Sequence, residues 1–575
     1  MADKVWRLRE LAPQSLLAEA EAAGIAPLVA QILCNRGLTD PVDMLAFLAA
    51  ESSAGHPLLL RDMGKAVALL RQALARGELV AVYGDYDADG LTATAVLVET
   101  IAALGGRAEP YIPHRTAEGY GLNLPALERL RSRQAGVLLT ADCGIGSVEE
   151  VAYARAHGLV VIVTDHHEVH GPLPCADAVV NPKRLGNGYH LRDLAGVGVA
   201  FKLAEALALS VDAARWPGIE TRLLDLVAIG TVADIVPLLG ENRALVKRGL
   251  RALNGTARPG LLEMAALAGL PIGSLDEGHI GYGIAPRLNA AGRVADAWLA
   301  YHLLAETSRE EARRLALLLE RHNQERQRLT ESGLALARQL AERQLPTPLL
   351  LVADEQFSVG VVGLIAAKLA EEYGRPAVVL ERGADVCRGS ARSIEGFDIG
   401  RTIAGCADLL RRFGGHERAA GLAVDTDRLE SLRERLVALA TEEMAGRDLR
   451  PGLAIDAELD LAEVDWGLQQ SLSQLPPYGL GNAEPVFSSR ASVRECRAVG
   501  RNGAHLRLRL ESGAAEMTAV GFGLGGLAVM KPGEPVEVAY TIAVNEWNGE
   551  RRLELRLKDV RRSSSRLGDS QERGW

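Results

Sequence analysis

The sequence predicts an α/β protein in which a doubly wound parallel-sheet domain is joined by a long helix to a second α/β domain, followed by a C-terminal β-barrel. Three observations support this fold class. Between residues 65 and 164, amphipathic helical stretches alternate with short, continuously apolar strands, which is typical of a doubly wound parallel sheet. Residues 308–345 carry one long helical pattern, and after residue 450 short alternating strands replace the helices.

Length and composition limit the class of protein. A chain of 575 residues is too long for one core, and 48% hydrophobic residues with a mean hydropathy of +0.05 predict a soluble globular protein. No apolar stretch is long enough to span a bilayer, and the first residues lack the apolar core of a secretory signal. The six cysteines have no CxxC spacing, so neither zinc nor disulfides are predicted, and a cytoplasmic location is expected. The net charge of −10 excludes a uniformly basic surface but is compatible with a local basic groove.

Changes in composition and in the periodicity of apolar residues along the chain predict six segments. They are an N-terminal helical segment (1–50), the parallel-sheet domain (51–307), the connecting helix (308–345), the second α/β domain (346–450), the barrel (451–562) and a disordered tail (563–575). The parallel-sheet domain is expected to contain strands at 80–83, 136–140 and 159–164 and helices at 65–76, 94–104 and 147–157.

Three aspartates follow the first strand of the parallel sheet. Asp85, Asp87 and Asp89 alternate in VYGDYDADG, between an apolar run and a helical stretch. Three carboxylates this close repel one another unless a cation lies between them, and open α/β sheets keep their ligands at the carboxyl ends of strands. A divalent cation held by oxygen ligands is one interpretation. A solvated acidic turn or a helix N-cap is the alternative.

The pattern recurs after the next two strands and at the end of a later helix. Asp142 follows the second strand, Asp165, His166 and His167 follow the third, and Asp234 ends the helical stretch. Each residue alone has a simpler explanation, as a helix cap or a buried polar side chain. Because parallel strands end at one edge of their sheet, the recurrence favours a single shared metal site. Carboxylates with imidazole and no thiolate favour Mn²⁺ or Mg²⁺, and so many acids predict two ions.

Small and basic residues in the second α/β domain predict an anion site. Ser390 and Arg392 lie in RGSARS, and Gly414, Gly415 and His416 lie in GGHER. Glycine exposes backbone N–H groups, and the arginine fork binds phosphate through two hydrogen bonds. A tight turn explains GG alone, but the two segments together favour phosphate binding.

The C-terminal segment predicts a small Greek-key barrel of the OB type. Between residues 486 and 560 its strands follow one another without comparable helices, and Asn548-Gly549 is a hairpin signal. Residues 486–562 contain 13 Lys and Arg against 9 Asp and Glu, and His505, Arg507 and Arg509 share one face of a strand. A solvated face would give the same pattern, so the basic character alone is weak support for nucleic-acid binding.

Four segments in this order and spacing resemble the motifs of the DHH phosphoesterase superfamily: DYDADG, ADCG, TDHH and VADIVPL. The segment 392–422, which ends in GGHERAAG, resembles the DHH-associated domain. Over about residues 50–560 the arrangement resembles the single-stranded-DNA-specific 5′-to-3′ exonucleases of this superfamily. The resemblance implies a two-metal-ion enzyme that hydrolyses phosphodiester bonds in DNA repair and recombination. It also implies a monomer without membrane association, whose partners are single-stranded DNA, single-stranded-DNA-binding protein and a RecQ-type helicase.

The resemblance further implies roles for the metal ligands. Asp142 would bridge the two ions, Asp87 would bind mainly one of them, and Asp89, His166 and Asp234 would bind the other.

One position beside these ligands departs from the superfamily pattern. In pyrophosphatases of the superfamily a histidine four residues before the Asp87 position is a ligand, whereas this chain has Tyr83 there. Asp85 or water would then complete the shell of the first ion. Asp165 would orient a histidine, and His167 would face the scissile phosphate.

The DNA contacts are also implied by resemblance. Ser390 and Arg392 would hold the 5′-terminal phosphate with help from Arg115. Further along the strand, the implied contacts are Arg287, Asn289 and His416, with Gly414 and Gly415 beside it. A channel too narrow for a duplex would select single strands, and the barrel would extend the binding track.

Two other functions are compatible with the motifs. One is a DHH-type phosphodiesterase for short oligonucleotides or cyclic dinucleotides, and the other is a non-catalytic DHH-type DNA-binding scaffold. The first needs no C-terminal barrel, and the second would have lost metal ligands that this chain retains. The exonuclease is therefore favoured.

Overall fold

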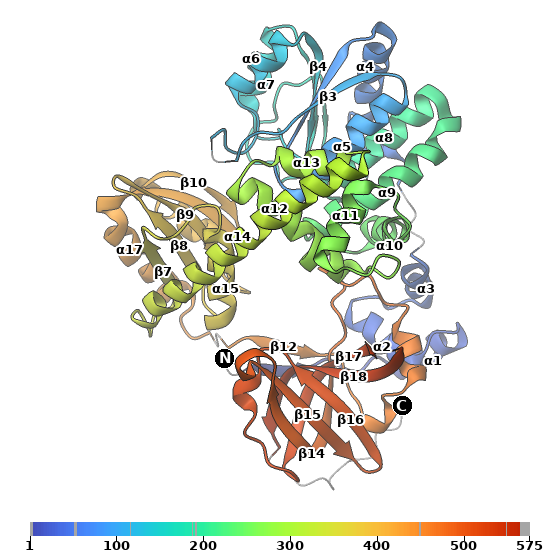
Figure 1. The fold of residues 1–575 in the computed structure, drawn as a ribbon, viewed down its shortest axis with the longest axis vertical. Coiled ribbons are helices and arrows are strands. Elements are labelled where there is room, and N and C mark those ends of the chain that lie inside the picture. The colour runs from blue at the N-terminus through green and yellow to red at the C-terminus, as the bar shows by residue number, and fades with distance from the viewer. Residues whose placement is uncertain are drawn as a thin grey trace. The chain divides into compact units, whose positions relative to one another are not determined.

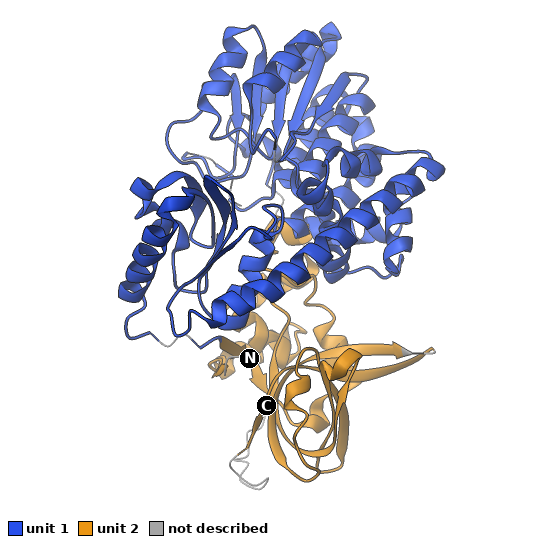
Figure 2. Cartoon of the chain, turned by 60° about the vertical axis from the view of Figure 1, so that its left-hand side comes forward, with its two compact units in different colours: residues 1–3, 55–236, 245–451 blue, residues 4–54, 237–244, 452–575 orange. Residues whose placement is uncertain are grey.

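The computed structural model describes residues 4–50, 55–115, 117–186, 188–189, 192–447, 450–547 and 549–563, which form two compact units (Figure 2). Unit 1 is built from residues 55–236 and 245–451, and unit 2 contains the described parts of 4–54, 237–244 and 452–575. Within the described ranges, no helix has both the length and the apolar character needed to cross a membrane.

The first sheet of unit 1 is parallel throughout, with the strand order β3-β2-β4-β5-β6 (Figure 1). Its strands are β2 (Leu79–Gly84), β3 (Arg107–Tyr111), β4 (Ala135–Ala141), β5 (Val160–Thr164) and β6 (Ala178–Val180). The helices around it are α4 (Met63–Arg76), α5 (Ala88–Ala103), α6 (Leu124–Ser132), α7 (Val148–Ala156) and α8 (Gly196–Asp212). Alternate side chains of β2 enter two cores, because Val80 and Val82 pack with α4, α5 and α8, whereas Ala81 and Tyr83 pack with α6 and α7. The doubly wound architecture is thus confirmed.

The helix after the acidic motif begins earlier than the sequence predicts. It was expected over 94–104, but α5 starts at Ala88 because the Asp87 carboxylate accepts hydrogen bonds from the N–H groups of Asp89 (3.0 Å) and Gly90 (3.1 Å). This capping bond places Asp89 in the first helical turn.

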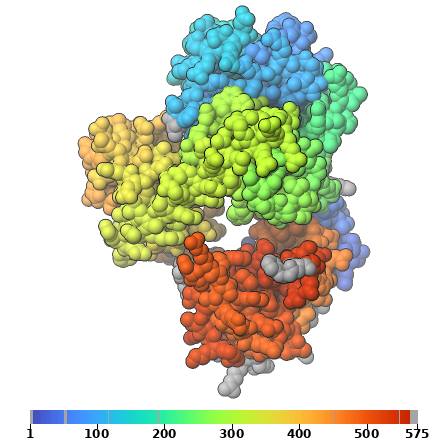
Figure 3. Space-filling view, in the orientation of Figure 1, coloured from blue at the N-terminus to red at the C-terminus, as the bar shows by residue number. Residues whose placement is uncertain are grey.

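A group of helices follows the sheet and ends in the long connector. These helices are α9 (Trp216–Ala233), α10 (Gly240–Asn254), α11 (Pro259–Ala268), α12 (Ala285–Val294), α13 (Trp298–Ala305) and α14 (Arg309–Glu342). The first half of α14 packs in the core of the first sheet through Leu315 and Leu319, and its second half packs in a separate core through Leu334 and Ala337. Helices α12 to α14 form one continuous surface in the space-filling view (Figure 3).

The second sheet of unit 1 is mixed, with the order β10-β11-β9-β8-β7, in which only β7 and β8 pair in parallel. Its strands are β7 (Leu350–Asp354), β8 (Ala377–Arg382), β9 (Val386–Arg392), β10 (Leu410–His416) and β11 (Ala419–Asp425). One face is covered over β7 and β8 by α14 and α15 (Val362–Tyr373), and the other by α16 (Ile399–Ala404) and α17 (Leu429–Glu443).

Unit 2 contains the predicted barrel. Five strands close it, because β14 pairs with both β15 and β17, while β16 and β18 pair in parallel. The barrel strands are β14 (Phe487–Val499), β15 (His505–Ser512), β16 (Ala515–Gly521), β17 (Pro535–Trp547) and β18 (Glu550–Arg562), with β13 (Ala457–Glu458) added to β14 and α18 (Trp466–Leu472) between them in the chain. The predicted hairpin residue Asn548 and residues 564–575 of the predicted tail lie outside the described residues.

The N-terminal segment is part of unit 2. Its helices α1 (Gln14–Ala22), α2 (Pro27–Asn35) and α3 (Pro41–Ala49) share one core with the barrel, and Asp40 caps α3 as predicted. The sequence did not predict the strand β1 (Val5–Leu8), which pairs in parallel with β12 (Gly452–Ile455). Arg243 joins the segments of unit 2, since its fully buried guanidinium donates hydrogen bonds to the carbonyls of Phe47, Gln474, Pro476 and Pro477.

Candidate metal centre

The structure brings the predicted acids and histidines of the first sheet together at one edge. Asp85 follows β2, Asp142 follows β4, and Asp165, His166 and His167 follow β5. Asp89 joins them from the first turn of α5, and Asp234 from the C-cap of α9. The strand ends and the two helices thus gather these side chains into one cluster, in which Asp85, Asp89, Asp142, Asp165 and His166 are buried.

The first turn of α8 closes the cluster from one side. Asp89 accepts hydrogen bonds from the N–H groups of Gly196 (2.7 Å) and Val197 (2.8 Å), so its carboxylate lies at the positive end of that helix. Asp142 has a left-handed backbone (φ 64°) and packs directly against Gly196. A Cβ at position 196 would lie 2.4 Å from Asp142 Oδ1, so only glycine fits there.

Two groups of three side chains have the spacing of metal ligands. In one group, Asp85, Asp87 and Asp142 offer atoms that all lie within 4.8 Å of one another, and in the other, Asp89, His166 and Asp234 do so. Asp142 also forms such a group with His166 and His167, so it lies between the two. His166 Nε2 is 3.1 Å from Asp142 Oδ1 and 3.5 Å from Asp234 Oδ2. Asp142 thus offers ligand atoms both to the first group and to the histidines.

Buried polar atoms of the cluster fit divalent cations. Within the described residues, Asp85 Oδ1, Asp142 Oδ1 and both ring nitrogens of His166 are buried and form no hydrogen bond. Leaving such an atom unpaired costs about 1–3 kcal/mol, and a bound cation removes this cost. Oxygen donors with one imidazole are the ligands that Mn²⁺ and Mg²⁺ accept.

The charges of the cluster lead to the same conclusion. Burial and then the neighbouring carboxylates raise the pKa of Asp142 and Asp234 well above the usual range and that of Asp89 to about 7. Burial and then the charge of His167 lower the pKa of His166 to about 3, so its imidazole is neutral, the form that binds metal. Mutual repulsion among the acids disfavours their charged forms unless a cation balances them.

Asp165 orients His167. Its Oδ1 accepts hydrogen bonds from the backbone N–H groups of His166 (2.7 Å) and His167 (3.0 Å) and from His167 Nδ1 (2.7 Å), while Oδ2 accepts one from the N–H of Ile145 (2.9 Å). Burial lowers the pKa of His167, but the hydrogen bond and the charge of Asp165 outweigh it and raise this pKa to about 9. The His167 side chain is 44% exposed, so it is accessible from solvent although Asp165 holds its Nδ1.

Tyr83 is not part of the metal cluster. Its hydroxyl donates a hydrogen bond to the Gly121 carbonyl (3.0 Å) and accepts one from Asn123 Nδ2 (3.0 Å), and its ring stacks on Tyr111. The side chain lies in the core with α6 and α7, on the far face of the sheet. Asp85, with an unpaired carboxylate oxygen, lies within the ligand group instead.

A group of arginines lies in the same unit. Arg392 Nη1 donates to Ser390 Oγ (2.7 Å), and the Arg115 guanidinium lies 4.9 Å from the ring centroid of Tyr86. Burial and then the charge of Arg115 lower the pKa of Arg392, so the two guanidiniums repel each other. Such a pair of positive charges suits an anion.

Arg293 also belongs to this group, although the sequence did not single it out. Burial and then the charges of Arg115 and Arg392 lower its pKa to about 9, and its Nη1 donates to the Gly360 carbonyl (3.1 Å). It lies at the end of APRLNAAGR, where no spacing distinguishes it from a surface arginine. Its place in the arginine group becomes apparent only from the contact between the end of α12 and Gly360, just before α15.

Two further predicted DNA contacts, Arg287 and Asn289, already have hydrogen-bond or ion-pair partners within the protein. Arg287 is held by Glu320 (2.7 Å) and the Gly283 carbonyl, and Asn289 Oδ1 accepts a hydrogen bond from the N–H of Ala88 at the start of α5.

The glycines and His416 lie on the edge strand β10. Gly415 has φ 154°, and a Cβ there would lie 2.4 Å from the Ala419 carbonyl, so this close approach of β10 to β11 requires glycine. Burial and then the charge of Arg392 lower the pKa of His416, with a smaller effect from His167. His416 therefore lies near both the arginine group and the metal cluster. Gly414 lies on the open side of the strand.

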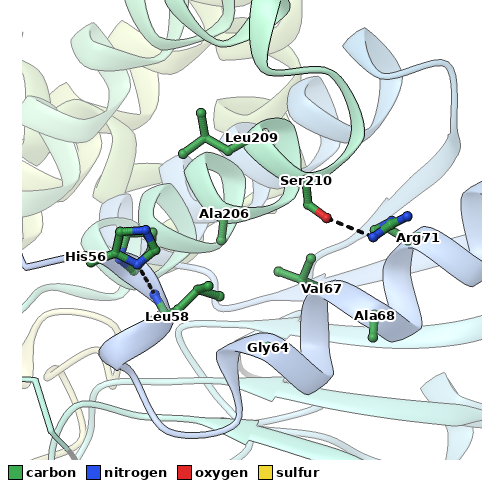
Figure 4. A pocket seen from close by; sticks show the side chains of 10 residues that line it. His56, Leu58, Gly64, Val67, Ala68, Arg71, Ala206, Leu209 and Ser210 are labelled. Atoms are coloured by element: carbon green, nitrogen blue, oxygen red, sulfur yellow. Dashed lines mark hydrogen bonds between the residues drawn. The ribbon is translucent and has the colours of Figure 1, made fainter.

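A separate pocket of about 360 Å³ lies between α4 and α8 (Figure 4). Leu58, Val67 and Leu209 line it, and Arg71 Nη1 contacts Ser210 Oγ (3.2 Å) at one side. None of the predicted ligands lines this pocket.

Comparisons with known proteins cover most of the chain. A model described as "DHH family, N-terminal domain" matches residues 79–231, one described as "DHHA1 domain" matches 347–442, and one described as "RecJ OB domain" matches 455–559. The single-stranded-DNA-specific exonuclease RecJ of Bacillus subtilis is 36% identical over 579 residues, which cover 99% of this chain and 72% of the relative.

Two solved structures of RecJ from Thermus thermophilus have the same fold. The complex with Mn²⁺ has a TM-score of 0.83 at 32% identity and covers 98% of this chain and 80% of that chain. The complex with Mg²⁺ has a TM-score of 0.77 at 30% identity and covers 98% and 79%.

Proposed function

Because the chain belongs to the RecJ family of single-stranded-DNA-specific exonucleases, we propose that its acidic cluster hydrolyses the phosphodiester bonds of a single DNA strand that enters by its 5′ end. One observation carries this proposal: Asp142 is a member of two of the metal-ligand groups, and the charges of Arg115 and Arg392 act on Arg293 in the same unit. The RecJ family acts in DNA repair and recombination. We place this enzyme in the cytoplasm as a monomer, with single-stranded-DNA-binding protein and a RecQ-type helicase as partners.

Two ions fit the ligand groups. Asp85, Asp87 and Asp142 would hold one, and Asp89, His166 and Asp234 would hold the other, with Asp142 common to both. The T. thermophilus relatives bind Mn²⁺ and Mg²⁺, which fits the oxygen-rich donor set here. When bound, such ions activate water and neutralise the charge that develops on the phosphate.

The protein's own residues position the strand and its charge. His167, charged and fixed by Asp165, donates a hydrogen bond to an oxygen of the scissile phosphate. Ser390, Arg392 and Arg115 hold the terminal 5′-phosphate, with Arg293 behind them. A fixed distance between this anion site and the acids would set the polarity, since only a strand whose 5′-phosphate is seated presents its next phosphate to His167.

The experiment offers the purified protein a 5′-phosphorylated single strand, the same sequence as a duplex, and a dinucleotide, each with Mn²⁺ and with Mg²⁺. We expect rapid release of nucleotides from the single strand only. Cleavage confined to the dinucleotide would instead indicate a short-oligonucleotide phosphodiesterase.

A variant tests the shared ligand. Asp142→Ala should abolish cleavage while single-strand binding, measured by fluorescence anisotropy, largely survives. Asp276→Ala, at an exposed aspartate far from the ligand groups in the sequence, is the matched control. Activity of Asp142→Ala above a few per cent of wild type would contradict a bridging role.

A further inference from the structure

One face of the second sheet of unit 1 continues from β8 over three further strands, beside the start of α15, where a Cβ on Gly363 would lie 3.3 Å from Ser390 Oγ. Side chains of β9, β11 and β10 on this face form rows across the strands, as the strand register defines them. The rows are Arg392-Ala419-His416, Ser390-Gly421-Gly414 and Arg388-Ala423-Arg412. Arginines, a histidine and a serine thus border a floor that consists only of glycine and alanine.

The floor is open to solvent. A Cβ built on Gly414 meets nothing within 4 Å, and one built on Gly421 reaches only the Gly389 carbonyl, at 4.0 Å. The alternate residues Cys387, Ala391 and Leu422 enter the core on the opposite face. The floor is therefore a flat strip with no bulky side chain standing on it.

Two arginines at the far end of the strip are available to a ligand. Arg388 and Arg412 are exposed and form no ion pair with any described residue, although Glu381 lies opposite Arg388 in β8. Arg411, the next residue along β10, is by contrast paired with Asp425. An unpaired guanidinium is suited to a phosphate, which it binds through two parallel hydrogen bonds.

The strip continues from the proposed end-phosphate site. The row of Arg392 and His416 lies at the opposite end of the strip from Arg388 and Arg412, and the charges of Arg392 and His167 both act on His416. Arg388 precedes Arg392 by four residues on the same face of β9, a distance of about 13 Å along an extended strand. Positive charge therefore extends beyond the site that would hold a terminal phosphate.

We propose that the strip between Arg388 and Arg412 binds the phosphate of a nucleotide on the 5′ side of the Ser390–Arg392 site. This inference rests on the proposed function and deepens it, because it assigns an upstream subsite to the same strand. With the upstream subsite filled, the second linkage of the strand lies at the metal centre. Water then adds to that phosphorus, the P–O3′ bond breaks, and O3′ takes a proton. The products are a dinucleotide with a 3′-hydroxyl and a strand with a new 5′-phosphate.

The test blocks the first linkage. Two 5′-phosphorylated single strands of one sequence are compared with Mg²⁺, one unmodified and one with a phosphorothioate at the first internucleotide linkage, which keeps its charge. Products are resolved by mass spectrometry. Wild type is expected to release mononucleotides from the first strand and a dinucleotide from the second.

Variants connect the result to the strip. In Arg388→Ala/Arg412→Ala, the ratio of dinucleotide from the modified strand to mononucleotide from the unmodified strand should fall at least fivefold. Arg411→Ala, which removes a paired arginine of the same strand, should leave this ratio unchanged. The single variants Arg388→Gln and Arg412→Gln should each lower the ratio and serve if the double variant is unstable.

The outcomes separate the two proposals. A wild type that stalls at the modified linkage, or a double variant whose ratio falls less than fivefold, overturns the upstream subsite. A wild type that fails to cleave the unmodified strand overturns the proposed function itself.

Discussion

Replacing Gly196 with alanine should inactivate the enzyme without removing a ligand. The residue begins α8, its N–H donates to Asp89, and its Cα faces Asp142. An added Cβ would lie 2.4 Å from Asp142 Oδ1 and 2.6 Å from its Cβ and Cγ, whereas ordinary contacts begin near 3.4 Å. Either the carboxylate or the start of the helix must therefore move by about 1 Å.

The magnitude follows from this displacement. Misplacing a catalytic group by ~1 Å costs about 10²-fold in rate, and overpacking a core costs about 1–3 kcal/mol of stability. We therefore expect kcat/KM on a 5′-phosphorylated single strand to fall about 100-fold. The melting temperature should fall by only several degrees, because ~1 kcal/mol corresponds to about 2–4 °C in a domain of this size.

The assay measures kcat/KM, Mn²⁺ affinity by calorimetry, and thermal unfolding. Gly198→Ala is the matched control, since its Cβ would meet only the flexible Leu194 side chain, at 3.2 Å. A Gly196→Ala protein with activity within threefold of wild type and unchanged Mn²⁺ affinity would refute the reasoning. Equal losses in the two variants would refute it as well.

Three further predictions concern ions, the buried tyrosine and unit 2. Removing metal with EDTA should lower the melting temperature more at pH 8 than at pH 5.5. The pKa of Asp89 is raised to about 7 in the fold, so a bound proton stabilises the metal-free protein at low pH. This stabilisation is lost as the pH rises toward 7. An equal effect of EDTA on the melting temperature at both pH values, measured by thermal scans, would contradict this prediction. Tyr83→Phe should lower the free energy of unfolding by about 1–2 kcal/mol, because Gly121 and Asn123 lose a buried hydrogen-bond partner. The kcat of this variant should stay within twofold of wild type. A tenfold loss of kcat would indicate a catalytic role. Arg243→Met should lower the stability of unit 2 by about 3 kcal/mol or more, since several buried carbonyls lose their donor. An unchanged midpoint of denaturant-induced unfolding would be evidence against this role of Arg243.

Local patterns were sufficient to predict three of the five strands of the first sheet and the acids that follow them, but not β3 and β6. Asp85, Asp142 and His166 each follow a short apolar strand, and a parallel sheet gathers such residues at one edge whatever the details of packing. The long helix and the barrel likewise follow from the period of their apolar residues.

Features that depend on distant segments were not predictable. Arg293 enters the anion group because its backbone packs against Gly360, which belongs to the next domain along the chain. Gly196 matters only because Asp142 lies against it, and β1 exists only because β12 offers it an edge. The start of α5 was misplaced because the sequence shows Asp87 as a candidate ligand but not as the cap that it also provides.

The composition of unit 2 from separate segments has a consequence for biosynthesis. Helices α1 to α3 are translated before unit 1, yet the barrel that covers their apolar side chains is translated after it. At about 5–20 residues per second, roughly 25 to 100 seconds pass between the two events. During that interval the exposed N-terminal side chains are a binding surface for chaperones, and a polypeptide that terminates early never buries them. The apolar side chains of α1 to α3 are therefore fully covered only after β18 has been made.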